Sequence, residues 1–260
     1  APFYAPMKAT CGAGGITPLG QGGAGDVNNH GVFLFGAAAA VSTVDGAISV
    51  TGTGAGNLSG NRGIQLDFNA TIQSTGSGDV TLVGQASTAG TTNNYGILLN
   101  NASVAAAGGA LSITGTGGGS GANNDGLLLG FGSITSTGAQ PIVISGNGAG
   151  AASGIQVIAP MTIGGASHSG DLILRAGTAS GADSIVLAGT VNGAGSLFIE
   201  PLNPTSTIGL AGGAGRLNLS SADLGTLADG FSQITIGHPS GTGLINVGSH
   251  TFSDPIIIRN

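Results

Sequence analysis

Short apolar segments recur along the chain, and most of them begin directly after a glycine. Six of these segments open at regularly spaced positions, namely Gly31, Gly63, Gly96, Gly126, Gly154 and Ser184. The steps between successive openings are 32, 33, 30, 28 and 30 residues. Self-similarity at a fixed interval of about 20 to 50 residues is typical of solenoids and other repeat folds. The pattern therefore predicts repeats of about 30 residues over positions 31–200.

Each repeat has the same internal layout of three short apolar strands followed by a glycine-rich loop. In the unit that opens at Gly63, the strands are expected at 64–68, 70–73 and 79–83. Three strands per repeat are typical of a coil with a three-sided cross-section. No segment has a helical apolar period, and the chain contains one Glu and one Lys, so helix should be negligible. The predicted fold is all-β, a right-handed parallel β-helix.

Two features of the openings predict how the coils stack. The pattern Asn-Asn-x-Gly occurs at 28–31, 93–96 and 123–126, and both Asn and Gly tolerate the positive φ of a sharp corner. Stacked coils would bring these amides together in a ladder, with Asn94 close enough to hydrogen-bond Asn124. Five apolar residues that follow their openings by one or two positions are expected to be equivalent: Ile64, Leu98, Leu128, Ile155 and Val186.

The two flanks differ from the regular repeats. Residues 1–30 are expected to form an entry segment and the first coil, and their first residues lack the features of a signal peptide. After 200 the period is broken at 202–204, and residues 201–260 are expected to continue the solenoid as variant coils. The apolar segment Ile256–Ile258 lies beside the last residue. We expect residues 250–260 to meet further β-helix, either in a longer chain or in a second copy.

The amino-acid composition argues against several classes of function. Charged residues make up 6% of the chain and the formal net charge is −6, so nucleic-acid binding is not expected. No apolar run approaches the length of a membrane span, so membrane insertion is not expected either. The single cysteine, Cys11, excludes an intrachain disulfide. Aromatic residues are only 4%, which favours a thin core of Ile, Leu, Val and Ala.

No residue pattern indicates catalysis, cofactor binding or a metal site. The acidic residues of the repeats stand alone in sequence and fit turns or exposed strand positions; they are Asp67, Asp79, Asp125, Asp171 and Asp183. The histidines lie in distant units without the paired spacing of zinc ligands, at positions 30, 168, 238 and 250. Accordingly, no catalytic, cofactor-binding or metal-binding residue is predicted, and no cofactor is expected.

The C-terminal stretch resembles a known family. The segments 222–224, 229–237 and 252–255 are similar to a recurrent module of filamentous-haemagglutinin-like exoproteins and related giant bacterial surface proteins. The Ser/Thr/Gly-rich repeats also resemble the β-strand-repeat passengers of that family. This resemblance implies a right-handed parallel β-helix, a secreted or cell-surface location, and a role in adhesion, aggregation or surface fibres.

Taken with the repeats, these features predict a structural or adhesive module that acts through an extended β-helix surface and end-to-end stacking. The expected partners are further coils of a longer chain or a second copy, with cell-surface or carbohydrate ligands as additional candidates. Two alternatives remain open at this point. One is a self-assembling extracellular fibre subunit, and the other is a polysaccharide lyase or hydrolase, which would need two carboxylates brought together by stacking.

Overall fold

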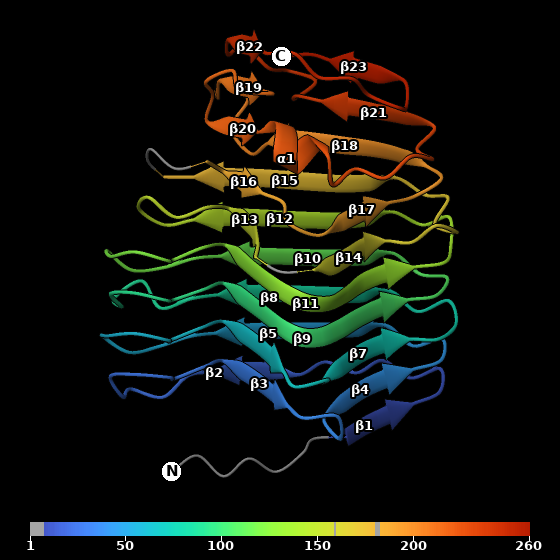
Figure 1. Cartoon of the computed structure of the whole chain (residues 1–260). Coiled ribbons are helices and arrows are strands. Elements are labelled where there is room, and N and C mark those ends of the chain that lie inside the picture. The colour runs from blue at the N-terminus through green and yellow to red at the C-terminus, as the bar shows by residue number, and fades with distance from the viewer. Residues whose placement is uncertain (1–7, 159, 180–182) are drawn as a thin grey trace.

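The chain forms a parallel β-solenoid of about six turns (Figure 1). The computed structural model describes residues 8–158, 160–179 and 183–260. Residues 1–7, with which the expected entry segment begins, lie outside the described residues. In the part of the chain that is described, the one α-helix is α1 (Ser221–Leu224). Both the all-β class and the near absence of helix are confirmed. No helix among the described residues has the length and apolar character needed to cross a membrane.

The strands of successive coils fall into three columns, as predicted. The first column contains β3 (Val32–Phe35), β6 (Ile64–Asp67), β13 (Ile155–Val157) and β16 (Ile185–Val186). The second contains β1 (Lys8–Cys11), β4 (Ala40–Thr43), β7 (Thr71–Ser74), β14 (Met161–Gly164) and β17 (Thr190–Asn192). Two longer strands bend through both columns, β9 (Ile97–Ala106) and β11 (Leu127–Ser136). The first two columns together form one parallel sheet.

The third column is a second parallel sheet. Its strands, in order along the stack, are β2 (Leu19–Gln21), β5 (Ile48–Thr53), β8 (Val80–Gln85), β10 (Leu111–Thr116), β12 (Ile142–Gly148), β15 (Leu172–Thr178), β18 (Ser196–Pro201), β21 (Gln233–Ile236) and β23 (Ile256–Ile258). Each strand pairs in parallel with the strand of the next coil. Residues that are about 30 positions apart in the sequence therefore lie next to each other in the structure.

The core consists of aliphatic rows that run along the stack. One row contains Ile64, Ile97, Leu127, Ile155 and Ile185, which are partners in successive coils and are fully buried. Burying one such side chain contributes about 1.5–3 kcal/mol relative to leaving it in water. Because alternate residues of a strand face opposite sides, a strand supplies every second residue to this core, as β8 does with Val80 and Leu82. The thin aliphatic core predicted from composition is what the coils contain.

The predicted equivalence of five apolar residues was wrong by one position. Leu98, Leu128 and Val186 share a row with Gln65 and Gln156, and this row faces away from the core. Ile64 and Ile155 belong instead to the inward row described above. The reason is that segments such as Leu127–Leu129 are apolar throughout, so the sequence does not reveal which alternate residues point inward.

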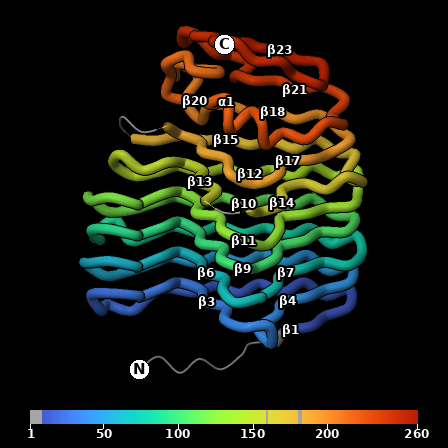
Figure 2. The backbone as a smooth tube through the Cα atoms, viewed as in Figure 1, coloured from blue at the N-terminus to red at the C-terminus, as the bar shows by residue number. Residues whose placement is uncertain are grey.

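Two facing rows of glycine bring the first and third columns into direct backbone contact. A Cβ placed on Gly115 would lie 2.2 Å from the carbonyl oxygen of Gly126, and one on Gly96 would lie 2.2 Å from the amide nitrogen of Thr116. Gly84 meets Gly96 in the same way in the neighbouring coil. Only residues without a side chain allow this approach. Beyond the contact, the chain leaves the coil as a loop, and these loops project from the same side in successive coils (Figure 2).

The C-terminal coils have a different outline. A third sheet contains β19 (Ile208–Leu210), β20 (Leu217–Leu219) and β22 (Ile245–Val247) in the order β20-β19-β22. The chain thus reaches β19 before it returns to form β20, which follows the first column. The backbone amide of Ser184 donates to the carbonyl of Arg216 at the junction between them. Helix α1 then occupies the place of the second column, where Leu227 bridges to Val191.

The glycine contact leads to a first prediction. Gly115→Ala should lower the free energy of unfolding by about 1–3 kcal/mol, because the added methyl group would overlap the Gly126 carbonyl and force a backbone shift. The measurement is urea-induced unfolding followed by circular dichroism. Gly12→Ala is the matched control, since nothing lies within 4 Å of a Cβ at that position. Equal destabilisation by the two variants would contradict the close packing of the glycine rows.

Candidate functional site

At the corner before each first strand, two neighbouring residues have different roles. The first residue adopts positive φ, with values of 56°, 57° and 56° at Asn28, Asn93 and Asn123. Gly60 takes the same place in the second repeat, with φ 74°. Such values are accessible to Asn and Gly at low cost. The first Asn of the motif therefore suits the backbone conformation of the corner, and Oδ1 of Asn93 also accepts from Nδ2 of Asn123 at 3.2 Å.

The second Asn of the motif forms a side-chain ladder. Asn94 donates from its backbone amide and from Nδ2 to Oδ1 of Asn124, at 3.0 and 3.4 Å. The backbone amide of Asn61 donates to Oδ1 of Asn94 at 2.8 Å, and that of Asn29 donates to Oδ1 of Asn61 at 3.0 Å. The predicted contact between Asn94 and Asn124 is confirmed. Asn61 was missed by the sequence pattern because Gly60 replaces the first Asn of its motif.

A column of polar and aromatic side chains stands next to this ladder, one residue further along each repeat. It contains His30, Arg62, Tyr95 and Asp125. The Arg62 guanidinium lies over the Tyr95 ring, 5.3 Å from its centroid. Oδ1 of Asp125 accepts from the backbone amide of Ser153 at 2.8 Å. The column thus places four ionisable groups on consecutive coils.

Arg62 also connects this column to the first strand of its own repeat. Its Nη1 donates to Oε1 of Gln65, and Nε2 of Gln65 donates to Oδ2 of Asp67. Asp67 and Asp125 are both buried, and one carboxylate oxygen of each makes no hydrogen bond among the described residues. The expectation of a turn or an exposed strand position was wrong for Asp67, which is buried in β6, whereas Asp125 lies at the corner before β11 but is buried there. Isolated acids in a sequence give no sign that stacked neighbours will cover them.

Burial dominates the electrostatics of the column. Desolvation, reinforced by the charge of Arg62, lowers the pKa of His30 to about 4. Desolvation raises the pKa of Asp125 to about 6, against the opposing effect of the Ser153 amide. The pKa of Tyr95 is also raised, first by burial and then by Asp125. The neutral forms of these side chains are therefore favoured inside the fold.

Asp67 and Asp125 are too far apart to act as a glycosidase pair. Asp67 shares a row with Asn100 and Gly130, so it lies two coils from Asp125 and five positions along the strand direction. With a coil spacing of about 4.8 Å and a strand rise of about 3.3 Å, their separation is about 19 Å. The paired carboxylates of glycosidases lie about 5–9.5 Å apart. This pair does not fit that chemistry.

The exposed acids serve as links between coils. Oδ1 of Asp79 accepts from the backbone amide of Ala110 at 2.8 Å, and Oδ1 of Asp183 accepts from Asn218 at 3.2 Å. Asp45 similarly accepts from the amide and hydroxyl of Ser77. Asp79, Asp171 and Asp183 are exposed and close to strand ends, in agreement with the sequence expectation. Carboxylates are thus used mainly to hold one coil on the next.

The histidines lie on separate coils. His168 is fully buried in a turn, where both ring nitrogens make no hydrogen bond among the described residues. His238 and His250 are half-buried in C-terminal loops, and Cys11 is half-buried in β1. Within the described ranges, no three His, Cys, Asp or Glu side chains converge as metal ligands would.

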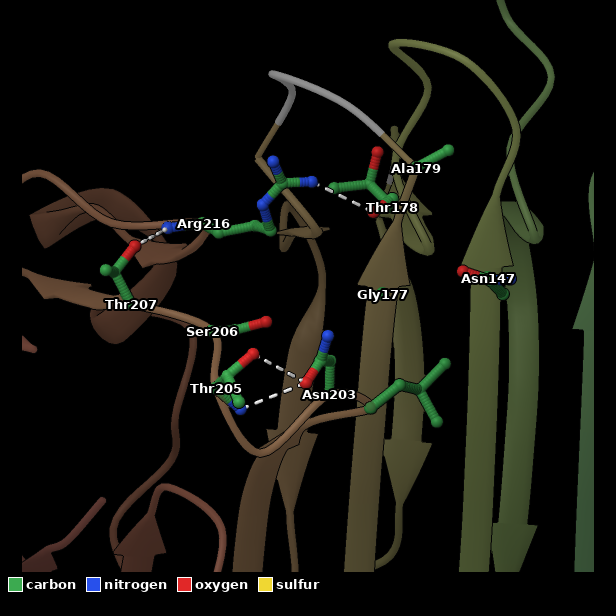
Figure 3. Close-up of a pocket in the computed structure, with 10 residues that line it drawn as sticks. Asn147, Gly177, Thr178, Ala179, Asn203, Thr205, Ser206, Thr207 and Arg216 are labelled. Carbon is green, nitrogen blue, oxygen red and sulfur yellow. Dashed lines mark hydrogen bonds between the residues drawn. The ribbon is translucent and has the colours of Figure 1, made fainter. Parts of the chain in front are cut away.

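A pocket of about 790 Å³ lies where the C-terminal coils change their outline (Figure 3). Its lining includes Asn147, Gly177, Leu202, Asn203 and Arg216. The loop after β18 supplies one side of the pocket, and the end of β15 with Ala179 supplies another. The break in the repeat at 202–204 was the only sequence sign of it. The strand order that creates the pocket could not be inferred from that break.

Comparison of the chain with family models, curated proteins and solved structures gave no match. The resemblance to filamentous-haemagglutinin-like exoproteins therefore rests on the sequence features described above. The structure shows that the chain is a parallel β-solenoid, but it does not assign the chain to a particular family.

The Asn ladder leads to a second prediction. Asn94→Leu should lower the free energy of unfolding by about 1–3 kcal/mol, because it leaves the buried amide of Asn61 without its acceptor. Thermal unfolding of the purified variant measures the loss. Asn57→Leu, at an exposed position in the neighbouring loop, is the control. An Asn94→Leu curve that superimposes on the wild-type curve would dismiss the ladder as a stabilising element.

The ionisable column leads to a third prediction, on pH dependence. The folded pKa of Asp125 is above its ordinary value of 3.8, so its contribution to stability is present below pH 4 and is lost as the pH rises through about 6. The folded pKa of His30 is below its ordinary value of 6.5, so its contribution is present above pH 6.5 and is lost as the pH falls through about 4. The two effects oppose each other between pH 4 and 6.

Removing the Asp125 carboxyl should leave the opposing contribution of His30 visible in the pH dependence of stability. Asp125→Asn keeps an acceptor for the Ser153 amide and removes the ionisable group, so stability should rise with pH between 4 and 6 more steeply than in wild type. At pH 7 the variant should gain up to about 3 kcal/mol. Urea unfolding at half-unit steps of pH gives both quantities. Asp171→Asn, at an exposed carboxylate, is the control, and parallel pH profiles for all three proteins would contradict the prediction.

Proposed function

We propose that this chain is a structural and adhesive module of a secreted or cell-surface bacterial protein. It acts through its long lateral faces and through stacking of its ends on further β-helix. The observation that carries the proposal is that, among the described residues, both ends of the solenoid combine unpaired strand edges with exposed apolar side chains. The resemblance of residues 222–255 to filamentous-haemagglutinin-like exoproteins supports the same role and the extracellular location.

The edge beyond β22 and β23 is open and apolar. Both strands stand last in their sheets among the described residues, and Leu244, Val247 and Ile257 are 72%, 59% and 41% exposed. In β23 the carbonyl of Pro255 and the amide of Arg259 point to β21. Because strand backbone groups alternate in direction, those of Ile256 and Ile258 point to the open side. Proteins usually protect such edges with charges, proline or a covering segment.

The opposite end of the solenoid also has an exposed strand edge with an apolar side chain. β2 stands first in the third column of the described chain, and its Leu19 is 80% exposed. Two different edges of one molecule, when they pair, form a head-to-tail contact that continues into an open filament. If the partner is a second copy, the chain is a fibre subunit. If it is more of the same polypeptide, the chain is one section of a longer β-helix.

The lateral surface suits contact over an extended area. Outward rows of the third column carry hydroxyl groups on successive coils, as in Ser49, Thr81 and Ser112. Asp45, Asp79 and Asp183 are occupied in coil-to-coil hydrogen bonds, and the buried Asp67 and Asp125 lie about 19 Å apart by the argument above. This distribution favours a structural role over the alternative of a polysaccharide lyase or hydrolase.

The proposal leads to a fourth prediction, on self-association. The mass of the wild-type chain in solution should rise above 24.6 kDa with concentration, and electron microscopy should show elongated stacks. Leu19→Lys together with Val247→Lys should suppress both, because edge lysines oppose strand pairing. Light scattering after size-exclusion chromatography gives the mass.

The matched control is Val83→Lys, which places the same charge on a lateral face away from both ends. It should associate as the wild type does. A wild-type chain that stays monomeric at every concentration would refute end-to-end stacking of copies. Release of sugar fragments from a polysaccharide by the purified chain would replace the structural role with the enzymatic one.

A further inference from the structure

The pocket beside the C-terminal coils carries a single positive charge. Arg216 is the one charged side chain among the described lining residues, in a chain with five Lys and Arg and a net charge of −6. Its Nη1 donates to the carbonyl of Thr178 at 3.0 Å, which fixes the guanidinium at the rim. The other guanidinium N–H groups make no hydrogen bond among the described residues. They remain free to donate to a ligand.

Neutral polar groups face this cation across the pocket. Thr205 donates from its backbone amide and from its hydroxyl to Oδ1 of Asn203, at 3.0 and 2.9 Å. These two bonds fix the orientation of the amide, so its Nδ2 is left as a donor. Figure 3 shows Asn203 and Thr205 on one side of the pocket and Arg216 with Thr178 on the other. The Ser206 hydroxyl lies between them in the lining.

Gly177 and Leu202 lie side by side in the lining, and we call this part of the pocket its floor. A Cβ placed on Gly177 would lie 3.0 Å from Cδ1 of Leu202 and 3.1 Å from Oδ1 of Asn147. Leu202 is 41% exposed and offers an aliphatic surface beside these amides. A volume near 790 Å³ falls within the range of about 300–1,000 Å³ that small-molecule sites occupy.

The groups that line the pocket indicate which functional groups its ligand should carry. A guanidinium with free N–H groups pairs best with a planar carboxylate, which it can bind through two parallel hydrogen bonds. Amides and hydroxyls on the opposite wall match a ligand with several hydroxyl groups, and Leu202 matches the C–H face of a sugar ring. No aromatic side chain lines the described pocket to stack on a nucleobase.

We infer that this pocket binds a carboxylated sugar residue of a glycan, with Arg216 pairing the carboxylate and Asn203 hydrogen-bonding ring hydroxyls. The inference names a ligand for the adhesive role proposed above and rests on that role for its biological setting. Binding in the pocket and stacking at the ends use separate residues. Failure of one is therefore distinguishable from failure of the other.

The test is calorimetric titration of the full chain with tetragalacturonate and with its fully methyl-esterified counterpart. The acid should bind at least tenfold more tightly than the ester, since the two probes differ only at the carboxyl group, which is an anion in one and a neutral methyl ester in the other. Arg216→Gln should abolish this preference, because it removes the positive charge that pairs with the carboxylate and keeps a neutral amide in its place. Arg259→Gln removes a cation outside the pocket and should leave both affinities unchanged.

Two further variants keep the test decisive if Arg216→Gln fails to fold. Asn203→Asp retains the acceptor for Thr205, removes the Nδ2 donor and adds a negative charge, so it should weaken acid binding at least tenfold more than ester binding. Gly177→Leu should fill the floor and weaken both probes. Equal binding of acid and ester, no binding of either, or loss of the preference in Arg259→Gln would overturn the inference. The mass measurements on the edge variants are independent of every one of these results.

Discussion

The structure depends on one constraint, the in-register parallel pairing of each coil with the next. Because a residue lies directly over its partner about 30 positions away, a side chain is in contact with its equivalents as well as with its own coil. Like residues then stack well together: aliphatic rows exclude water, facing glycines let backbones meet, and amides satisfy one another. The Asn94 and Asn124 contact exists only because the backbone ladder holds the two coils in the same register. Repetition in the sequence is therefore a packing requirement of this fold.

The same constraint explains where the repeats are free to vary. The steps between openings range from 28 to 33 residues, yet the third-column strands keep unbroken registers from β5 to β15. The differences in length are taken up by the projecting loops, where no strand pairing is required (Figure 2). The Asn ladder does not extend through all of the repeats. It ends in the repeat where Ala152 stands two residues before Gly154, in the position that Asn124 holds before Gly126.

Sequence reasoning recovered the features that repeat and missed those that depend on facing direction or strand order. The period, the three strands per coil and the amide ladder follow from spacing, and the structure has them. The register of Leu98 and Leu128 was wrong by one because all three residues of each segment are apolar. Burial of Asp67 and Asp125 depends on neighbours in other coils, which a single repeat does not reveal. The pocket depends on the order β20-β19-β22, in which chain order and spatial order differ.

The few cations of this chain show how it uses charge. Glu200 is buried between Arg175, whose Nε lies 2.9 Å from Oε2, and Arg259, whose Nη2 lies 3.9 Å from Oε1. Gly237 occupies the coil between Glu200 and Arg259, and its lack of a side chain lets the pair approach. Charges taken from water are stable when they are paired or hydrogen-bonded, and these three meet that condition across several coils. Arg216 differs, because among the described residues its side chain donates to a neutral carbonyl and to no carboxylate, and its charge lies at the mouth of a pocket.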